Sequence, residues 1–254
     1  MVAERQAGPR RKARRRPADS KRPSRRIGPA RAGRILDILE LAHPEARCAL
    51  DHRNPYELVV ATILSAQCTD ARVNLVTPDL FRRYPTPDAL AAAQPEQVEP
   101  LIRSTGFFRS KAASLIGFAR GIVERHDGRV PATLEGLVRL PGIGRKTANV
   151  VLGHAFRTAE GIAVDTHVLR VAVRLGLARD GDAEKVEAEL MALLPRRRWT
   201  RASDLLIFHG RKLCGARRPA CADCPVFHAC QWPSRQAFAT HVLAPAASPR
   251  RGGR

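Results

Sequence analysis

Four cysteines near the C-terminal end are the feature that most constrains how this chain can fold. Their spacing is Cys214-x6-Cys221-x2-Cys224-x5-Cys230, so that a single short segment carries all four thiols. This spacing is too tight for an ordinary disulfide framework and indicates a metal centre instead. Four cysteines can hold either zinc or a four-iron, four-sulfur cluster, and the chemistry of the ligands alone does not choose between them.

Helix-start signals recur through the middle of the chain, and no strand pattern competes with them. Asn54-Pro55-Tyr56-Glu57 offers a capping residue, a proline at the first helical position and a glutamate at the third, followed by an apolar run. Thr86-Pro87-Asp88 opens a second helix in the same way, and residues 110–126 keep apolar side chains at helical spacing. We therefore expect an all-α fold with a substantial core.

A hairpin between two helices is predicted around residue 142. A short helix over residues 133–139 stops at Leu140-Pro141-Gly142-Ile143-Gly144, and a new helix starts from Lys146 onward. The two glycines are expected to adopt backbone angles that side chains forbid, so that amide hydrogens face outward at the positive end of the second helix. A phosphate group fits there, although a Pro and Gly turn between helices is by itself weak evidence for nucleic acid.

The charge of the chain favours a partner that is densely negative. Lysine and arginine number 44 against 24 aspartate and glutamate, a net charge of +20, and nucleic acid is the first candidate. Residues 1–33 lack an apolar period and are expected to form a disordered basic tail, as are residues 234–254. No secretory signal or membrane span is recognisable, so an intracellular protein with no membrane partner is expected; an organellar transit peptide is disfavoured by four prolines in the tail.

Several of these motifs together closely resemble the endonuclease III family. The motifs are Leu140-Pro141-Gly142-Ile143-Gly144-Arg145-Lys146-Thr147-Ala148, then Val164-Asp165-Thr166-His167-Val168-Leu169-Arg170-Val171, then the cysteine spacing. The earlier segments, residues 64–70 and 106–112, fit the same family. The resemblance runs from about residue 34 to residue 233, and the motifs occur in the right order and at the right distances.

The resemblance implies an all-α, two-lobed helix-hairpin-helix DNA glycosylase fold with a C-terminal four-cysteine iron-sulfur cluster loop. A six-helix lobe containing the hairpin would span residues 54–159. The other lobe would join residues 34–53 to residues 160–233, with the active site in the cleft between the lobes. The resemblance also favours a [4Fe-4S] cluster over zinc. The cluster would be held by four ligands with a structural role: Cys214, Cys221, Cys224 and Cys230.

The implied activity is that of a bifunctional DNA glycosylase and AP lyase of base excision repair. Lys146 would displace an oxidised pyrimidine at the anomeric carbon and remain attached to the sugar as a Schiff base, which acidifies the neighbouring sugar hydrogen and leads to elimination of the 3′ phosphate. The helix start disfavours positive charge on Lys146, and Arg145 is expected to act in the same direction. Asp165 would assist base loss, and it could also cap the helix that follows.

The resemblance assigns further residues to DNA contact. They are Gln67, Phe107, Gly142, Gly144, Arg145, Thr147, Arg217 and Arg218. Gln67 would fill the gap left by the flipped nucleotide. Phe107 stands where the family often has a smaller aliphatic residue, and Thr105 replaces another apolar neighbour, which leaves lesion breadth and opposite-base preference open. Arg217 and Arg218 lie between the first two cysteines, in a loop that meets the phosphate backbone in the family.

Three residues within or beside these motifs are interpreted as structural. Cys48 and Cys68 stand alone in the sequence, and a lone cysteine is usually a small buried apolar residue. His167 is interpreted as a satisfied structural histidine, with a supporting role at the active site as the alternative. The spacing from Lys146 to Asp165 is one residue longer than the family pattern, and we place the extra residue in the turn over residues 157–161, where loops absorb insertions.

Other functions remain open at this point. An adenine mismatch glycosylase shares the fold but typically lacks the hairpin lysine and adds a C-terminal domain, so Lys146 and the short ending after Cys230 oppose it. A non-catalytic DNA-binding protein would form no covalent adduct, and a zinc-dependent regulator would lack the colour of an iron-sulfur protein. The expected partner is double-stranded DNA with damaged pyrimidines or abasic sites, bound by a monomer in the bacterial cytoplasm, near the nucleoid.

Overall fold

The computed structural model describes residues 27–179 and 181–239 of the chain, and every regular element within these ranges is helical. The α-helices are α1 (Pro29–Ala42), α2 (Pro55–Leu64), α3 (Asp70–Arg83), α4 (Pro87–Ala91), α5 (Pro95–Ile102), α6 (Phe108–His126), α7 (Leu134–Val138), α8 (Arg145–His154), α9 (Thr166–Leu175), α10 (Ala183–Leu193), α11 (Trp199–Lys212) and α12 (Arg235–Ala239). Short 3-10 helices are η1 (Arg103–Thr105), η2 (Arg196–Arg198) and η3 (Cys221–Asp223). The predicted all-α fold is confirmed. None of the described helices has both the length and the apolar character to cross a bilayer.

Capping hydrogen bonds confirm the predicted helix starts. The Asn54 side chain accepts from the backbone N–H of Glu57 at 2.9 Å at the start of α2. Thr86 caps α4 in the same way, because its hydroxyl accepts from the N–H of Ala89 at 3.2 Å. The buried Glu57 carboxylate reaches one residue further back than a capping box requires, and accepts from the N–H of Arg53 at 2.7 Å.

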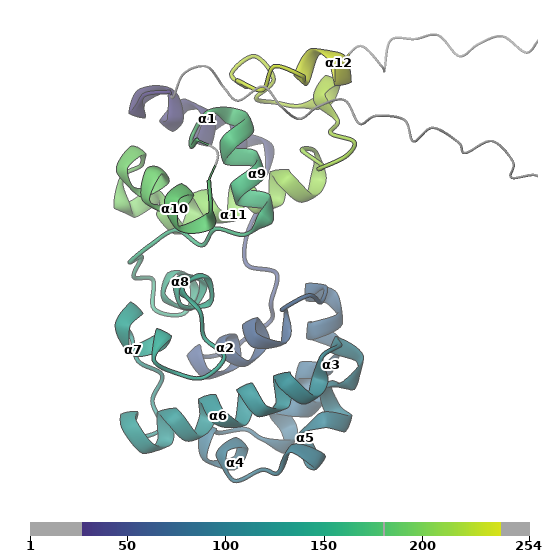
Figure 1. Ribbon diagram of the computed structural model, residues 1–254, viewed down its shortest axis with the longest axis vertical. Coiled ribbons are helices and arrows are strands. Elements are labelled where there is room, and N and C mark those ends of the chain that lie inside the picture. The colour runs from purple at the N-terminus through teal and green to yellow at the C-terminus, as the bar shows by residue number, and fades with distance from the viewer. Residues whose placement is uncertain (1–26, 180, 240–254) are drawn as a thin grey trace, which may run out of the picture.

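Two separate hydrophobic cores organise the described chain. One core is built mainly from α2 to α8, and the other from α1, α9, α10 and α11. In Figure 1 the two groups lie at opposite ends of the molecule, and α8 lies between them. We use "hairpin lobe" for residues 54–159 and "cysteine lobe" for residues 27–53 and 160–239. The divisions at residues 53/54 and 159/160 are taken from the sequence and remain a proposal that the two cores support, whereas the outer ends, 27 and 239, are those of the described residues.

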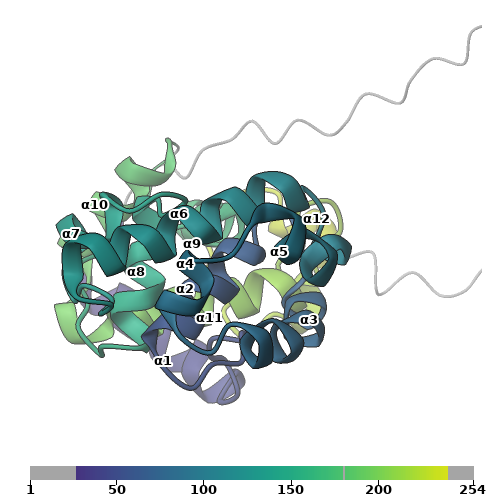
Figure 2. The same cartoon turned by 90° about the horizontal axis from the view of Figure 1, so that it is seen from below.

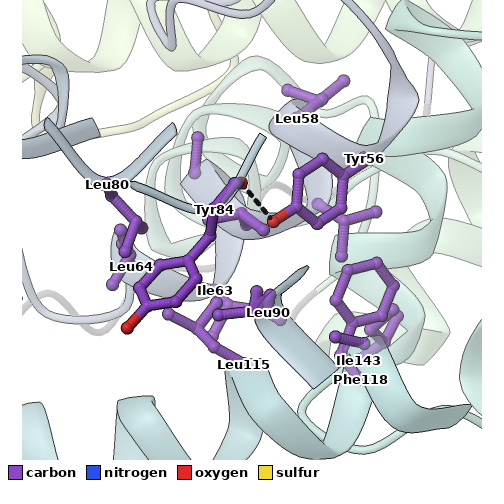
Figure 3. Packing of buried hydrophobic residues seen from close by; sticks show 14 of the residues in the cluster. Tyr56, Leu58, Ile63, Leu64, Leu80, Tyr84, Leu90, Leu115, Phe118 and Ile143 are labelled. Atoms are coloured by element: carbon purple, nitrogen blue, oxygen red, sulfur yellow. Dashed lines mark hydrogen bonds between the residues drawn. The ribbon is translucent and has the colours of Figure 1, made fainter. Parts of the chain in front are cut away.

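The hairpin lobe has a densely packed aromatic and aliphatic centre (Figure 3). The Tyr56 ring stacks on Phe118 with ring centroids 6.3 Å apart, and the Tyr56 hydroxyl donates to the carbonyl of Tyr84 at 3.0 Å. Figure 2 shows α6 running across the width of this lobe, and α2, α4 and α5 pack against it. The described residues of this lobe form seven α-helices, α2 to α8, one more than the six expected. The helices predicted after Thr86 and over residues 133–139 are α4 and α7, and each starts at a capping threonine.

The disordered tail predicted over residues 1–33 extends too far toward the C-terminus. Helix α1 begins at Pro29, and the side chain of Ile27 packs into the core of the cysteine lobe. The backbone N–H of Ile27 also donates to the carbonyl of Gly176 at 3.2 Å. Ile27, Ala32 and Ile35 supply the apolar spacing that the prediction overlooked. The remainder of the predicted tail lies outside the described residues.

The predicted C-terminal tail over residues 234–254 likewise begins too early. Residues Arg235–Ala239 form α12, and the ring of Phe238 stacks on Trp232 with centroids 5.3 Å apart. Arg235 also lies over the Phe227 ring, at 5.8 Å from its centroid. These aromatic contacts give the segment a packed partner that could not be inferred from its composition. Residues 240–254 lie outside the described part of the chain.

Candidate active site

The predicted hairpin joins α7 to α8 and leaves the first turn of α8 accessible. Gly142 has φ +77°, and an added Cβ would lie 2.8 Å from Cβ of Ser114, so the position requires glycine. Gly144 is different, because its φ is −90° and an added Cβ would meet nothing within 4 Å. The expectation that both glycines adopt forbidden angles is therefore wrong for Gly144. Gly144 is the exposed N-cap of α8 and offers no side-chain cap, so the first N–H groups stay available to an anion.

Lys146 and Asp165 line the same cleft. Lys146 is the second residue of α8, and Asp165 is the residue immediately before α9. The cleft has a volume of about 560 Å³ and takes its lining from both lobes, including Ser65 from the hairpin lobe and Phe208 from the cysteine lobe. Lys146 is exposed and Asp165 is half-buried. Two residues predicted from separate motifs are thus brought to one place by the packing of α8 against α11.

Asp165 is held in place by capping α9. Its Oδ1 accepts from the N–H of His167 and from the N–H of Val168, each at 2.8 Å. Both bonds use the same oxygen, which fixes the carboxylate group at the positive end of the helix. The capping role anticipated for Asp165 as an alternative is therefore confirmed. Both capping bonds go to Oδ1, so Oδ2 takes no part in capping the helix.

An ion pair and a histidine–carboxylate contact in the cleft were not anticipated from the sequence. Asp70 at the start of α3 pairs with Arg211 of α11 at 2.6 Å, which links the two lobes. His154 at the end of α8 pairs with Asp204 of α11 at 3.2 Å. All four residues line the cleft. Asp70 belongs to a motif noted above, but no sequence spacing relates it to a partner so distant in the chain.

Arg145, which precedes Lys146 in α8, is paired with a buried carboxylate. Its Nε donates to Oε2 of Glu187 at 2.6 Å, and Glu187 is buried between α8 and α10. The other oxygen of Glu187 accepts from the Asn149 amide at 2.8 Å. The hydrogen bond to Glu187 raises the pKa of Arg145. The charge of Glu187 offsets part of the effect that Arg145 was expected to have on Lys146, and that effect itself stays a prediction.

Gln67 and Phe107 protrude from the hairpin lobe on strained backbone. Both are non-glycine residues in the left-handed region, with φ of 53° and 47°. Gln67 is exposed, and Phe107 is 65% exposed although it is a large apolar side chain. The left-handed conformation costs about 1–2 kcal/mol per non-glycine residue, so the surrounding structure must impose it. Thr105, in contrast, is buried, and its hydroxyl donates to the carbonyl of Ile102 at 2.8 Å.

The four predicted cysteine ligands line one small pocket at the end of α11. Cys214 follows α11, Cys221 begins η3, and the other two lie in the loops after it. Burial raises the pKa of Cys221 to about 11 and that of Cys224 to about 12, and the neighbouring cysteines act in the same direction. The described side chains form no ready group of three or more His, Cys, Asp or Glu that could hold a metal ion. Four thiols around a shared pocket nevertheless are the donor set of a thiolate-bound metal centre.

A buried arginine braces this cysteine site. The guanidinium of Arg174 lies 4.0 Å from the ring centroid of Trp232 and donates to Sγ of Cys214 at 3.4 Å. It also donates to the carbonyls of Gly215 and Ala216, at 2.9 and 3.1 Å. These bonds hold the start of the loop that carries Arg217 and Arg218, whose side chains are exposed as expected for contact with a phosphate backbone.

Two buried histidines lead to another cysteine of the site. Nε2 of His43 lies 3.1 Å from Nδ1 of His209, and Nε2 of His209 lies 3.6 Å from Sγ of Cys224. Burial lowers the pKa of His209 to about 4, and the neighbouring His43 acts in the same direction. Burial also lowers the pKa of His43, and His43 ties the end of α1 to the cysteine site. Neither histidine belongs to a recognisable sequence pattern.

The residues interpreted as structural occupy mixed positions. Cys48 and Cys68 pack against the core of the hairpin lobe but are only half-buried, and both line the cleft that contains Lys146. His167 lies beside Arg170, whose guanidinium is 3.0 Å from its Nδ1. Burial lowers the pKa of His167. The expectation that Cys48 and Cys68 are buried is therefore wrong, because both are half-buried and line the wall of the cleft.

Comparison with known proteins identifies close relatives of the chain. Residues 60–196 match the family model described as the HhH-GPD superfamily base excision DNA repair protein. The chain is 53% identical to endonuclease III of Synechocystis over 207 residues, covering 82% of this chain and 94% of the relative. It is 46% identical to endonuclease III of Bacillus subtilis over 197 residues, covering 77% and 90%.

Solved structures agree with these sequence relatives. A trapped endonuclease III–DNA covalent intermediate has a TM-score of 0.78 and 42% identity, and covers 83% of this chain and 99% of its own. A thermostable thymine-DNA glycosylase has a TM-score of 0.68 at 20% identity, which is a likeness of fold alone.

Proposed function

The chain belongs to the endonuclease III family of HhH-GPD base excision DNA repair proteins and is a DNA glycosylase and AP lyase, and we propose that Lys146 and Asp165 carry out its chemistry. The observation that carries this proposal is the shared cleft between the lobes, which both side chains line. A relative has been captured as a covalent intermediate with DNA, in agreement with a nucleophile from the protein.

Lys146 is the proposed nucleophile in both reactions. Its amine attacks C1′ of an extruded nucleotide, the C1′–base bond breaks, and the base leaves with a proton. The amine loses its protons as the sugar ring opens, so that a Schiff base joins Nζ to C1′. Removal of a proton from C2′ then expels the 3′ phosphate, and water releases the sugar from the lysine.

Asp165 is proposed to support base loss from a fixed position. Oδ1 is engaged by the two backbone N–H groups of α9, so the carboxylate cannot rotate freely. Oδ2 can then face the positive charge that develops on the sugar ring, or accept a proton in the course of the reaction. Preorganisation of this kind is worth more than the same charge on a mobile side chain, because the cost of orienting it is met by folding.

The DNA is proposed to lie across the mouth of the cleft. The first turn of α8, with Gly142, Gly144 and Thr147, would receive a phosphate through backbone N–H groups. Arg145 is engaged by Glu187 and would contribute orientation more than free charge. Arg217 and Arg218 would meet the backbone from the cysteine loop. Gln67 and Phe107 would enter the duplex where the damaged nucleotide leaves it.

Cys214, Cys221, Cys224 and Cys230 are proposed to hold a [4Fe-4S] cluster. The four sulfurs surround one pocket, and Arg174 already donates to one of them. When bound, the cluster would cross-link the loop and its neighbours and could supply one-electron redox chemistry. Base release and strand cleavage as derived above need only groups of the chain.

The proposed substrate is duplex DNA with an oxidised pyrimidine or an abasic site. The proposed enzyme acts as a monomer, and its location is the bacterial cytoplasm with the nucleoid, where this substrate occurs. Phe107 and Thr105 depart from the family pattern, which leaves the lesion preference of the enzyme open. A panel of lesions, scored separately for base release and for nicking, measures that preference directly.

Reductive trapping tests the nucleophile. Borohydride should trap wild-type protein on duplex DNA that contains an oxidised pyrimidine or an abasic site, because it reduces the Schiff base to a stable amine. Lys146→Ala should abolish the trapped band and lower base release by more than about 10³-fold, while duplex binding stays within about threefold.

Lys185→Ala is the matched control, since Lys185 is an exposed lysine of α10 paired with Asp182, outside the cleft. It should behave as wild type in both trapping and binding. Unchanged trapping in Lys146→Ala would point to another nucleophile and would refute the assignment.

A further inference from the structure

Lys111 is a buried lysine that the proposed chemistry does not use. It lies in the first turn of α6 and is only 5% exposed. Its Nζ donates to the carbonyl of Leu64 at 2.7 Å and to the carbonyl of Thr105 at 2.8 Å. Burial lowers the pKa of Lys111, and the described residues give it no carboxylate partner within ion-pair distance. A lysine buried without a counterion is rare and calls for a reason.

The two carbonyls belong to the two segments that end in Gln67 and Phe107. Leu64 is the last residue of α2, three positions before Gln67. Thr105 is the last residue of η1, two positions before Phe107. In both segments, the residue whose carbonyl Lys111 binds is followed within a few positions by an exposed residue with left-handed backbone angles. One ammonium group therefore joins the bases of two protruding loops that are about forty positions apart in sequence.

We infer that Lys111 is a positioning residue that sets the relative placement of Gln67 and Phe107, the two side chains proposed to enter the duplex. The inference rests on the proposed function, because it gives these loops their role. Lys111 itself touches neither DNA nor the reacting sugar. It acts through the two carbonyls that it holds.

Helix α6 supplies a rigid base for this arrangement. It is 19 residues long, and α2, α4 and α5 pack against it (Figure 2). The backbone N–H of Lys111 also donates to the carbonyl of Phe107 at 3.0 Å, so the same residue holds this loop at two points. The Leu64 carbonyl lies at the negative end of α2, which favours a cation there. A long, flexible stem with several donors suits this task better than any neutral side chain.

The backbone hydrogen bonds within each of the two loops are local. In the first, Cys68 N–H donates to the carbonyl of Ser65 at 3.1 Å, and in the second, Gly106 N–H donates to the carbonyl of Arg103 at 3.3 Å. These bonds are local to each loop and say nothing about the distance between the loops. Among the described contacts of Leu64 and Thr105, the bonds to Lys111 are the ones that connect the two segments through a common atom.

The test compares cleavage of duplex and single-stranded DNA by Lys111→Met. To act on an abasic site in duplex DNA, the enzyme must fill the gap that the extruded nucleotide leaves in the duplex, whereas a single strand has no such gap. Single-turnover nicking of the duplex should fall roughly 10- to 100-fold, while nicking of the single strand stays within about twofold. Because both rates come from one preparation, their ratio is insensitive to the fraction of folded protein. Lys111→Gln, which keeps a smaller donor, is measured alongside.

Tyr56→Phe is the matched control. It removes a buried side-chain bond to a backbone carbonyl in the same lobe, that of Tyr84 (Figure 3), and this bond involves neither Lys111 nor the two carbonyls that Lys111 holds. Its duplex to single-strand ratio should equal that of wild type. A fluorescent base opposite the abasic site gives a second readout, since its emission change on binding should be reduced in Lys111→Met and retained in Tyr56→Phe.

The outcomes separate this inference from the proposed function. If wild-type protein nicks and traps neither DNA, the proposed function fails. Suppose that wild type is active and that the Lys111 variants lose duplex and single-strand nicking to the same extent, or lose neither activity. Lys111 is then merely structural, and the inference is overturned. A Gln67→Ala background supplies the final check: Lys111→Met should add less than about threefold there if it acts through that loop, and its full effect would contradict the inference.

Discussion

Asp165 shows how one side chain can serve the fold and the chemistry together. Its Oδ1 satisfies two N–H groups at the start of α9, which is an ordinary capping role. The same bonds hold the carboxylate at the wall of the cleft that Lys146 lines. The two roles make different demands on the side chain, because capping needs an acceptor oxygen and charge stabilisation needs a full negative charge.

Substitutions at Asp165 should separate the two roles. Asp165→Asn keeps the cap and removes the charge, so the free energy of unfolding should change by less than about 0.5 kcal/mol while base release falls by about 100-fold or more. Asp165→Ala removes both and should also cost about 1 kcal/mol of stability. Urea unfolding and single-turnover base release are the measurements. Equal stability loss in both variants would show that charge, not capping, holds α9.

Among the elements, the hairpin divides its work between two glycines of different character. Gly142 has a left-handed backbone and no room for a side chain beside Ser114. Gly144 has ordinary extended angles and open space, so its contribution is access to the start of α8. Glycine at position 142 is therefore required by the fold, and we propose that glycine at position 144 serves the binding of DNA.

Alanine at each glycine should expose this difference. Gly142→Ala should destabilise the protein by about 2 kcal/mol or more, since strain in the left-handed region adds to the overlap with Ser114. Gly144→Ala should cost under about 0.5 kcal/mol and weaken duplex binding through the added methyl group near the phosphate. Chemical unfolding and binding titrations test both. A large stability loss at Gly144 would contradict the view that its glycine serves binding.

At the scale of the whole molecule, two lobes with separate cores meet along a cleft that carries the proposed chemistry. Helix α8 belongs to the core of the hairpin lobe and also packs against α11 of the cysteine lobe. The Asp70–Arg211 pair connects the lobes directly. This arrangement places Lys146 in one lobe and Asp165 in the other, and the net charge of +20 favours the binding of DNA.

Deletion of residues 1–26 tests whether the basic tail takes part in binding. The segment carries eleven lysines and arginines and two acidic residues. If it binds phosphates, the slope of log Kobs against log salt should become shallower by about 0.9 for each phosphate that the shortened protein no longer neutralises. Single-turnover nicking at saturating DNA should be unchanged, because the cleft is intact. An unaltered slope would show that the tail does not bind DNA.

The sequence by itself determined the helical class, the capped helix starts, the hairpin and the residues proposed for catalysis. These features are local: a cap, a proline at the first helical position or a cysteine spacing acts over a few residues, so a linear pattern can reveal it. The family resemblance added the roles of Lys146 and Asp165. The sequence failed at the tail boundaries, because composition concealed Ile27, which packs against distant parts of the chain, and Phe238, which stacks on Trp232.

Only the tertiary structure decided which residues meet. The pairing of Arg145 with Glu187, of Asp70 with Arg211 and the two bonds of Lys111 join helices whose separation in sequence follows no pattern. Each of these interactions depends on how whole helices pack, and packing is set by the summed shape of many side chains rather than by the residues that finally touch. For that reason the cleft, its ion pairs and the link between the two protruding loops became visible only in three dimensions.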